Sequence, residues 1–145
     1  MILISACLIG ENVTYDGSNN YHAVAKALYD SGQAIAVCPE VFGGLPTPRT
    51  PAEIQGELVV SRDGIDVSRY FQAGAKKTLN IALQNNATLA ILQARSPSCG
   101  VHQIYDGTFS RTLIDGEGLT TRLLRENGIT VITIEDYIRD YYEAD

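Results

Sequence analysis

Short apolar runs that alternate with helix-like segments are the feature that most limits the fold of this 145-residue chain. Each run is too short for an ordinary helix and is rich in Ile, Leu, Val or Ala. Continuous apolar runs are typical of strands covered on both faces, and strands that alternate with helices pair in parallel. We therefore predict an α/β three-layer sandwich with a mostly parallel sheet, whose strands are Ile2–Ala6, Ala34–Val37, Thr88–Leu92 and Ile129–Ile134.

The segments between these runs carry helix and turn signals. Asn19 or Asn20 can cap a helix that Gly32 ends, and Ser68 can cap the longest helix, which runs to about Asn86. Two apolar triplets flank an Arg-Asp-Gly turn and indicate a small inserted β-hairpin, Leu58–Val60 with Ile65–Val67. Further predictions are an irregular segment at Gly43–Pro51, a glycine-rich stretch with a short hairpin at Ser96–Gly118, and helices from Thr120 or Thr121 to Asn127 and from Glu135 to Tyr142.

Composition excludes several classes of protein. Hydrophobic residues make up 45% of the chain and charged residues 19%, which is ordinary for a globular protein. A chain of this length is expected to form a single domain over residues 1–145. Its 11 basic and 17 acidic residues give a net charge of −6, so we expect no binding to duplex nucleic acid, which basic side chains recognise.

The sequence carries no signal for a membrane or for export. No apolar stretch approaches the ~20 residues that a membrane helix needs, and Met1 leads into the first apolar run without a basic region. Ile4–Cys7 looks like a lipoprotein cleavage box, but the apolar stretch before it is shorter than the ~7–15 residues of a signal sequence. We therefore expect a cytoplasmic protein, in which cysteines stay reduced and often act as ligands or nucleophiles.

Three cysteines fall at corresponding places in the predicted sheet. Cys7 follows the first strand, Cys38 follows the second, and Cys99 lies a few residues past the third. Ligands of open parallel sheets bind outside the carboxyl ends of the strands, so these three side chains are expected at one edge. Their odd number and wide separation make a disulfide framework a poor explanation, whereas three buried core cysteines remain the simple alternative.

Two kinds of metal centre fit three thiolates, which are soft ligands. A structural zinc site needs a fourth ligand, for which His22 or His102 are the available histidines. A [4Fe-4S] cluster held by three cysteines leaves one iron without a protein ligand, and such an open position can bind substrate as a Lewis acid. The cysteine spacing alone does not separate the two.

Polar residues beside the cysteines are candidates for chemistry. Glu40, two residues past Cys38, can act as a general acid or base, although a solvated loop carboxylate is the alternative. Arg49 can clamp an anion or carbonyl of a substrate, or it forms a surface ion pair. Asp16 shares the loop that begins at Cys7, and its alternative role is a turn. Ser96 and Ser98 adjoin Cys99, where serines also serve as turn caps.

Several motifs together resemble one known family. They are Ser5-Ala6-Cys7-Leu8-Ile9-Gly10, Tyr15-Asp16-Gly17, Cys38-Pro39-Glu40-Val41, Gly43-Gly44-Leu45-Pro46-Thr47-Pro48-Arg49 and Ser96-Pro97-Ser98-Cys99-Gly100. In this combination the chain is similar, over nearly its whole length, to the DUF523 family of thiouracil desulfidases. The resemblance implies a Rossmann-like fold and an oxygen-sensitive [4Fe-4S] cluster held by Cys7, Cys38 and Cys99.

The resemblance also implies an activity. The unique iron would bind the sulfur of a thiolated pyrimidine such as 2- or 4-thiouracil, and the sulfur would be removed without net redox chemistry to leave uracil. Glu40 and Ser98 then become candidates for proton handling, with Asp16 nearby, and Ser96 and Arg49 for substrate binding. Ser98 is favoured over Ser96 because it adjoins Cys99.

Alternatives remain open on the sequence alone. The chain can be a zinc-stabilised or metal-free nucleotide-binding module without catalysis, or a different cluster enzyme or sulfur carrier on the same scaffold. Within the desulfidase hypothesis, either water activated by Glu40 attacks the thiocarbonyl carbon or the iron-bound species takes the sulfur directly. The sequence carries no signal of oligomeric state.

Overall fold

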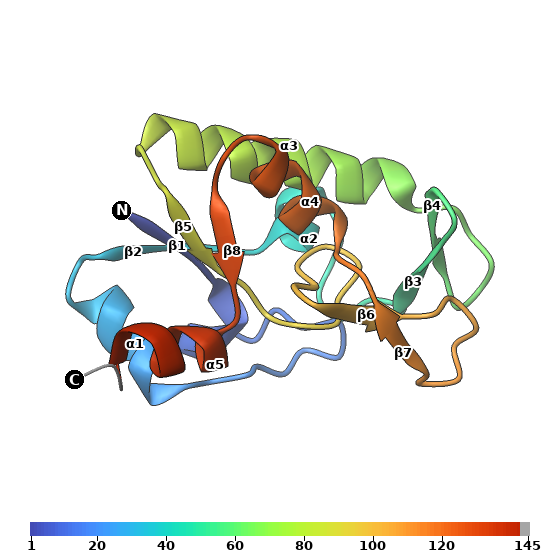
Figure 1. Cartoon of the computed structure of the whole chain (residues 1–145). Helices are drawn as coiled ribbons and strands as arrows, with labels where there is room; N and C mark the ends of the chain where they lie inside the picture. Colours follow the sequence, from blue (N-terminus) through green and yellow to red (C-terminus); the bar gives the residue numbers. More distant parts are fainter. Residues whose placement is uncertain (143–145) are drawn as a thin grey trace.

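A four-stranded parallel sheet forms the centre of the molecule (Figure 1). The computed structural model describes residues 1–142. The strands are β1 (Ile2–Ser5), β2 (Ala34–Val37), β5 (Leu89–Ile91) and β8 (Thr130–Ile132), and they lie in the order β2-β1-β5-β8. All three pairings are parallel. The predicted strands and their parallel pairing are thus confirmed, with the ends shortened by one or two residues in three of them.

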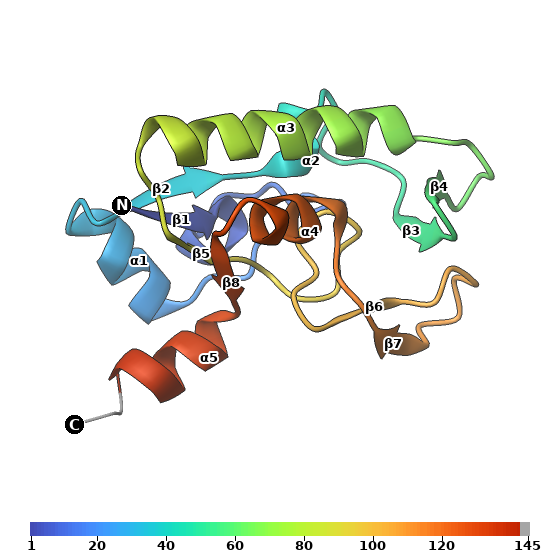
Figure 2. The ribbon, with the colours of Figure 1, turned by 45° about the horizontal axis from the view of Figure 1, so that its top comes forward.

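Helices cover both faces of this sheet (Figure 2). One face carries α2 (Pro39–Phe42), α3 (Ser68–Gln84) and α4 (Leu119–Glu126), and the other carries α1 (Ala23–Asp30) and α5 (Ile134–Tyr137), which continues into the π-helical turn η2 (Ile138–Tyr142). Among the described residues, no helix has the length and apolar character that crossing a membrane requires.

Alternating residues of the strands build two separate cores. Leu3 and Ala90 pack in the cluster beneath α3 and α4, whereas Ile4 and Ile91 pack in the cluster beneath α1 and α5. Successive side chains of a strand point to opposite faces, so a strand that is apolar throughout must be covered on both. The predicted three-layer α/β sandwich is therefore confirmed.

Two small hairpins extend from the sheet, where the sequence predicted one inserted hairpin and a second short one. They are β3 (Ala52–Gln55) with β4 (Leu58–Ser61), and β6 (Gln103–Tyr105) with β7 (Leu113–Asp115). The predicted pairing of 58–60 with 65–67 is confirmed at its centre: Val60 and Asp66 form an antiparallel bridge, and the N–H groups of Ser61 and Val67 donate to the Ile65 and Val59 carbonyl oxygens, each at 2.9 Å. The prediction missed the main partner of this strand, because the turn at Gly56, with φ +63°, pairs all of β4 with β3.

Two of the predicted helix caps are wrong. His22 is the N-cap of α1, and its Nδ1 accepts a hydrogen bond from the Val24 N–H at 3.2 Å. Ser68 is already the first residue of α3, and its Oγ accepts from the Val59 N–H at 2.8 Å, so it fastens the helix to β4. The predicted residues, Asn and Ser, are of types that often cap helices, but contacts elsewhere in the fold determine which residue acts as the cap.

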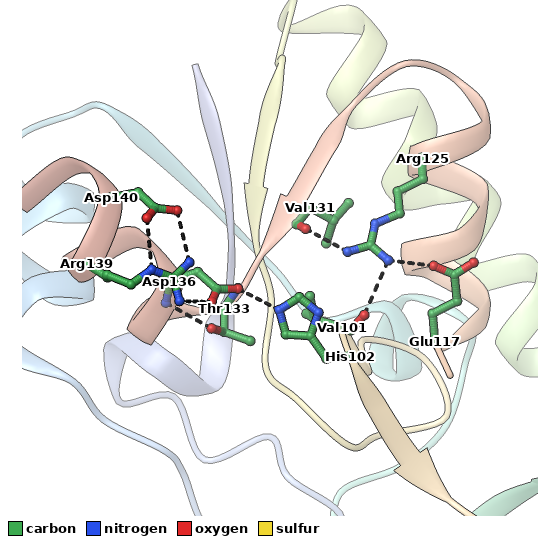
Figure 3. A network of polar contacts seen from close by, with 9 residues as sticks. All are labelled: Val101, His102, Glu117, Arg125, Val131, Thr133, Asp136, Arg139 and Asp140. Atoms are coloured by element: carbon green, nitrogen blue, oxygen red, sulfur yellow. Dashed lines mark hydrogen bonds and ion pairs between the residues drawn. The ribbon is translucent and has the colours of Figure 1, made fainter. Parts of the chain in front are cut away.

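Polar networks fasten the C-terminal elements to the rest of the molecule (Figure 3). Arg125 of α4 donates to the carbonyl oxygens of Val101 and Val131 at 3.3 and 2.9 Å, and to Glu117 at 2.7 Å. At the start of α5, Thr133 and Asp136 form a capping box, and Asp136 also contacts His102 Nε2 at 2.7 Å. The loop that follows Cys99 is thereby held against both α4 and α5.

Candidate functional site

The three cysteines follow three neighbouring strands and line one cavity. Cys7 lies in the 3-10 turn η1 (Ala6–Ile9) directly after β1, Cys38 is the N-cap of α2 directly after β2, and Cys99 lies in the loop beyond β5. The cavity has a volume of about 430 Å³ and opens at the carboxyl edge of the sheet, as expected for a parallel α/β protein. Residues far apart in the sequence thus meet because the strand order places β1 between β2 and β5.

Burial dominates the electrostatics of these thiols, all of which are free. Burial raises the pKa of Cys7 and of Cys38 above the ordinary value, and it raises the pKa of Cys99 to about 12. The other two thiols and Glu40 contribute to this raised pKa of Cys99, because a thiolate there would meet their negative charge. These side chains are therefore neutral thiols at neutral pH unless a cation draws off their protons.

Hydrogen-bond donors point at two of the sulfur atoms. Asn20 Nδ2 lies 3.4 Å from Cys7 Sγ, and Ser5 Oγ lies 3.7 Å from Cys99 Sγ. Ser98 Oγ is also 3.7 Å from Cys99 Sγ, but it donates its one proton to Glu40. Donors of this kind stabilise a thiolate and tune a metal that it binds. Sequence reasoning missed Ser5, although a serine at the end of an otherwise apolar buried strand is a detectable signal.

The N-terminus of α4 holds the Cys99 loop in place. Leu119 and Thr120 donate their N–H groups to the carbonyl oxygens of Pro97 and Ser98, at 2.8 and 2.9 Å, and Thr121 Oγ1 donates to the Cys99 carbonyl at 2.8 Å. The first N–H groups of a helix have no acceptor inside the helix, and the carbonyl oxygens of this loop accept their hydrogen bonds. These bonds attach the segment that carries Ser98 and Cys99 to the start of α4.

A carboxylate, a hydroxyl and a guanidinium meet beside the thiols. Ser98 Oγ donates to Glu40 Oε2 at 2.7 Å, and Arg49 Nε donates to Glu40 Oε1 at 3.0 Å. Glu40 occupies the first turn of α2, one residue beyond Pro39. Its carboxylate therefore lies on the cavity wall and is not the solvated loop residue that the sequence left open.

Arg49 joins this carboxylate to the loop that begins at Cys7. Its Nη2 donates to the Val13 carbonyl at 2.9 Å, and its Nη1 lies within hydrogen-bond distance of Pro46 O and Thr47 Oγ1. Only 7% of the side chain is exposed, so the ion pair with Glu40 is not on the surface. Each nitrogen of the guanidinium already has a protein partner.

Asp16 and Ser96 lie at the same cavity but are engaged in their own loops. Asp16 Oδ1 accepts from Ser18 Oγ, Thr14 Oγ1 and the Ser18 N–H, and these bonds lower the pKa of Asp16 to about 2. Ser96 Oγ accepts from the Cys99 N–H at 2.7 Å and lies 3.2 Å from Ser98 Oγ. Ser96 thus caps the Cys99 turn, and Ser98 is the serine in contact with Glu40.

Further lining residues come from the hairpins and from the loop after β5. Sequence reasoning did not connect them with the cysteines, because the pairing of β4 with β3 was missed and the second hairpin had no detailed alignment. For Phe109 a signal was available, because a large aromatic residue stands there between Thr108 and Ser110 in a polar turn. These further lining residues are Glu53, Arg62, Arg95, Tyr105, Phe109 and Arg111.

The chain accordingly has the features of a Rossmann-like α/β protein with a thiol-lined site at the carboxyl edge of its sheet. In the described part of the chain, no group of three or more His, Cys, Asp or Glu side chains is arranged around a single metal ion. A cluster instead distributes its ligands over several irons, so its cysteines stand farther apart than those of one ion.

The chain belongs to the 2-thiouracil desulfurase family, whose model matches residues 2–136. It is 42% identical over 143 residues to the uncharacterized protein YbbK of Bacillus subtilis (strain 168), covering 92% of this chain and 95% of that protein. The solved structure of the [4Fe-4S]-dependent thiouracil desulfidase TudS (DUF523) matches with a TM-score of 0.92 and 46% identity, over 99% of this chain and 95% of that one. The resemblance seen in the cysteine motifs is therefore confirmed, and the family is one of enzymes.

Proposed function

We propose that this protein is a [4Fe-4S]-dependent desulfidase that removes sulfur from a thiolated pyrimidine of the 2- or 4-thiouracil type and leaves uracil, without net redox change. The observation that carries the proposal is the meeting of three free cysteines, from three neighbouring strands, on the wall of one cavity beside Glu40 and Ser98. Family membership and the similarity to TudS support the same activity and cofactor.

The residues present fit the cluster. Cys7, Cys38 and Cys99 would hold it, since iron bound to their sulfurs would supply the positive charge that these buried thiols need to ionise. Asn20 and Ser5 would donate to the ligating sulfurs. When bound, a [4Fe-4S] cluster with three cysteine ligands supplies one iron with an open position, a soft Lewis acid suited to a thiocarbonyl sulfur.

Glu40 and Ser98 would handle the protons of the reaction. Replacing sulfur by a water-derived oxygen requires a proton to leave the attacking water and another to reach the departing sulfur. Glu40 Oε2 shares a hydrogen bond with Ser98 Oγ, so the pair can accept a proton at one atom and pass it through the other. Arg49 holds the second carboxylate oxygen and fixes its direction.

The remaining candidates take supporting roles in this proposal. Ser96 orients Cys99 and Ser98, and Arg49 connects Glu40 with the loop at Val13 in preference to binding substrate directly. Asp16 would stay ionised at neutral pH, because its pKa is about 2, and would shape the rim of the cavity. We further infer a single domain and a cytoplasmic location, where the three free thiols would stay reduced.

The test is turnover by protein prepared and assayed without oxygen. Cluster-loaded protein is incubated with 2-thiouracil and with 4-thiouracil, and uracil and sulfide are both quantified. The proposal predicts one uracil and one sulfide for each thiouracil consumed, with no added reductant or oxidant. Binding of pyrimidines without turnover, together with stoichiometric zinc, would instead support a nucleotide-binding module. Release of sulfide only from some other thiolated compound would indicate a different cluster enzyme.

A further inference from the structure

Glu53 is a buried carboxylate that the proposed chemistry does not use. It lies in β3, only 8% exposed, and its Oε1 accepts hydrogen bonds from the N–H groups of Gly107 and Phe109, at 2.9 and 3.1 Å. Charged side chains are rarely buried unless a partner requires them. Here the partner is the backbone of the loop between β6 and β7, residues 106–112.

This loop is held in an unusual conformation. Phe109 and Arg111 have φ values of +58° and +62°, in the left-handed region that bulky residues rarely adopt. Gly107 packs so closely that a Cβ atom there would lie 2.7 Å from the Ile54 carbonyl oxygen. Gln55 Nε2 also donates to the Gly107 carbonyl at 2.7 Å. The β3–β4 hairpin therefore clamps the loop at Gly107 and Phe109.

The clamp places one aromatic ring at the cavity. Phe109 lines the same cavity as the three cysteines and is only half-buried, in a loop whose neighbours Thr108 and Ser110 are exposed polar residues. The Arg62 guanidinium lies 5.8 Å from the centre of its ring. The strained backbone thus holds a partly exposed phenyl ring, a flat apolar group, on the wall of the cavity.

We propose that Phe109 is the surface on which the pyrimidine ring of the substrate stacks, and that Glu53 is the positioning residue that holds it there. The inference rests on the proposed function, because it takes the substrate to be a pyrimidine. Every base presents a π face to an aromatic ring, so this contact selects a flat ring while leaving the sulfur free to face the thiols. Of the other two aromatic residues of the cavity, Tyr15 is held through its carbonyl oxygen by the Arg49 N–H at 2.7 Å and Tyr105 by strand pairing in β6, but Phe109 alone of the three has a positive φ.

The first test replaces the ring. Phe109→Ala is expected to raise KM for thiouracil about 5- to 150-fold, the worth of one stacked base, while kcat changes little because the contact is the same in ground and transition states. Phe109→Tyr should behave like the wild type, and Phe109→Leu, which is apolar without a ring face, like Phe109→Ala. Equilibrium dialysis of uracil against cluster-loaded protein gives a readout without turnover and should weaken by the same factor. Leu83→Ala, an exposed apolar residue of α3, is the control.

The second test concerns the clamp. Glu53→Ala should raise KM as Phe109→Ala does and should speed trypsin cleavage after Arg111, whereas Glu53→Gln, whose amide oxygen still accepts both N–H groups, should restore both values. Glu57→Ala, at the exposed turn of the same hairpin, is the matched control.

Two results separate the inference from the proposed function. If the wild type desulfurates thiouracil but Phe109→Ala keeps the wild-type KM and uracil affinity, the stacking role is wrong and the desulfidase proposal stands. If the wild type neither binds uracil nor consumes thiouracil, both are overturned.

Discussion

The two carboxylate oxygens of Glu40 have different partners, and this division gives the side chain its direction. Arg49 binds Oε1 and Ser98 binds Oε2, so only the second oxygen faces a group that can exchange a proton. Glu40→Gln keeps the size and hydrogen-bonding ability of the side chain but removes its capacity to take up a proton. We expect a loss of turnover of about 10²–10⁴-fold, the usual contribution of a general acid or base, with the cluster retained.

The measurement is kcat together with iron content and the visible spectrum of the same anaerobic preparation. Glu126→Gln, an exposed carboxylate of α4, serves as the matched control. Wild-type turnover in Glu40→Gln would remove Glu40 from the catalytic group, and loss of iron would give it a structural role.

Among individual residues, the sequence predicted those that are close to a cysteine along the chain and missed those that reach the site from other strands. Glu40 and Ser98 were found because they are neighbours of Cys38 and Cys99 along the chain. Ser5 and Glu53 were not, because their relevance depends on which strands pair and which side faces inward. The spacing of residues along the sequence does not predict contacts between segments that are far apart in the chain.

The crossing of α2 and α3 decides where Cys38 and Glu40 lie. The two helices meet through glycines, since a Cβ at Gly43 would lie 1.9 Å from Tyr70 O and a Cβ at Gly74 would lie 1.8 Å from Pro39 O. Gly74→Ala should thus force α2 away, lowering the free energy of unfolding by about 1–3 kcal/mol and reducing cluster retention.

A loss of stability in Gly74→Ala would be specific evidence for the close contact between α2 and α3. Replacing Gly by Ala inside an unobstructed helix usually stabilises a protein, by up to about 1 kcal/mol. Urea unfolding of Gly74→Ala measures the sign of its effect on stability, with Gln72→Ala, an exposed position in the same helix, as the control. A stabilised Gly74→Ala variant would show that the close crossing of α2 and α3 is not a constraint.

Elements were more predictable than their partners. The four buried strands and the longest helix follow from apolar runs and helical periodicity, which depend on the chain itself. The pairing of β4 with β3 was missed, although the turns on both sides of β4 contain a glycine with positive φ, Gly56 and Gly64. Both turns are used, since β4 pairs with β3 and also forms a bridge to Asp66.

For the molecule as a whole, Asp136 links the end of the chain to the loop beyond the cysteine site. Burial acts to raise its pKa, but hydrogen bonds with His102 and Thr133 outweigh this and hold the pKa of Asp136 below 3.8. A lowered carboxyl pKa contributes stability that is present above the unfolded value and is lost as the pH falls through the folded value.

Asp136→Asn should therefore cost about 1–3 kcal/mol of unfolding free energy at pH 5, the range for hydrogen bonds to a charged group. The gap between wild type and variant should shrink between pH 5 and pH 3, as measured by urea unfolding. Asp63→Asn, in an exposed loop, should show no such gap. A gap that stays constant down to pH 3 would contradict the ionised role of Asp136.

The central claim is that the strand order brings three distant cysteines into one ligand set. It is tested most directly by iron and acid-labile sulfide assays on anaerobically prepared wild type and on Cys7→Ser, Cys38→Ser and Cys99→Ser. The account predicts about four iron and four sulfide per wild-type chain, as a [4Fe-4S] cluster requires, and loss of most of both in each variant. A colourless wild type that cannot be reconstituted with iron and sulfide, or full iron content in any one variant, would contradict it.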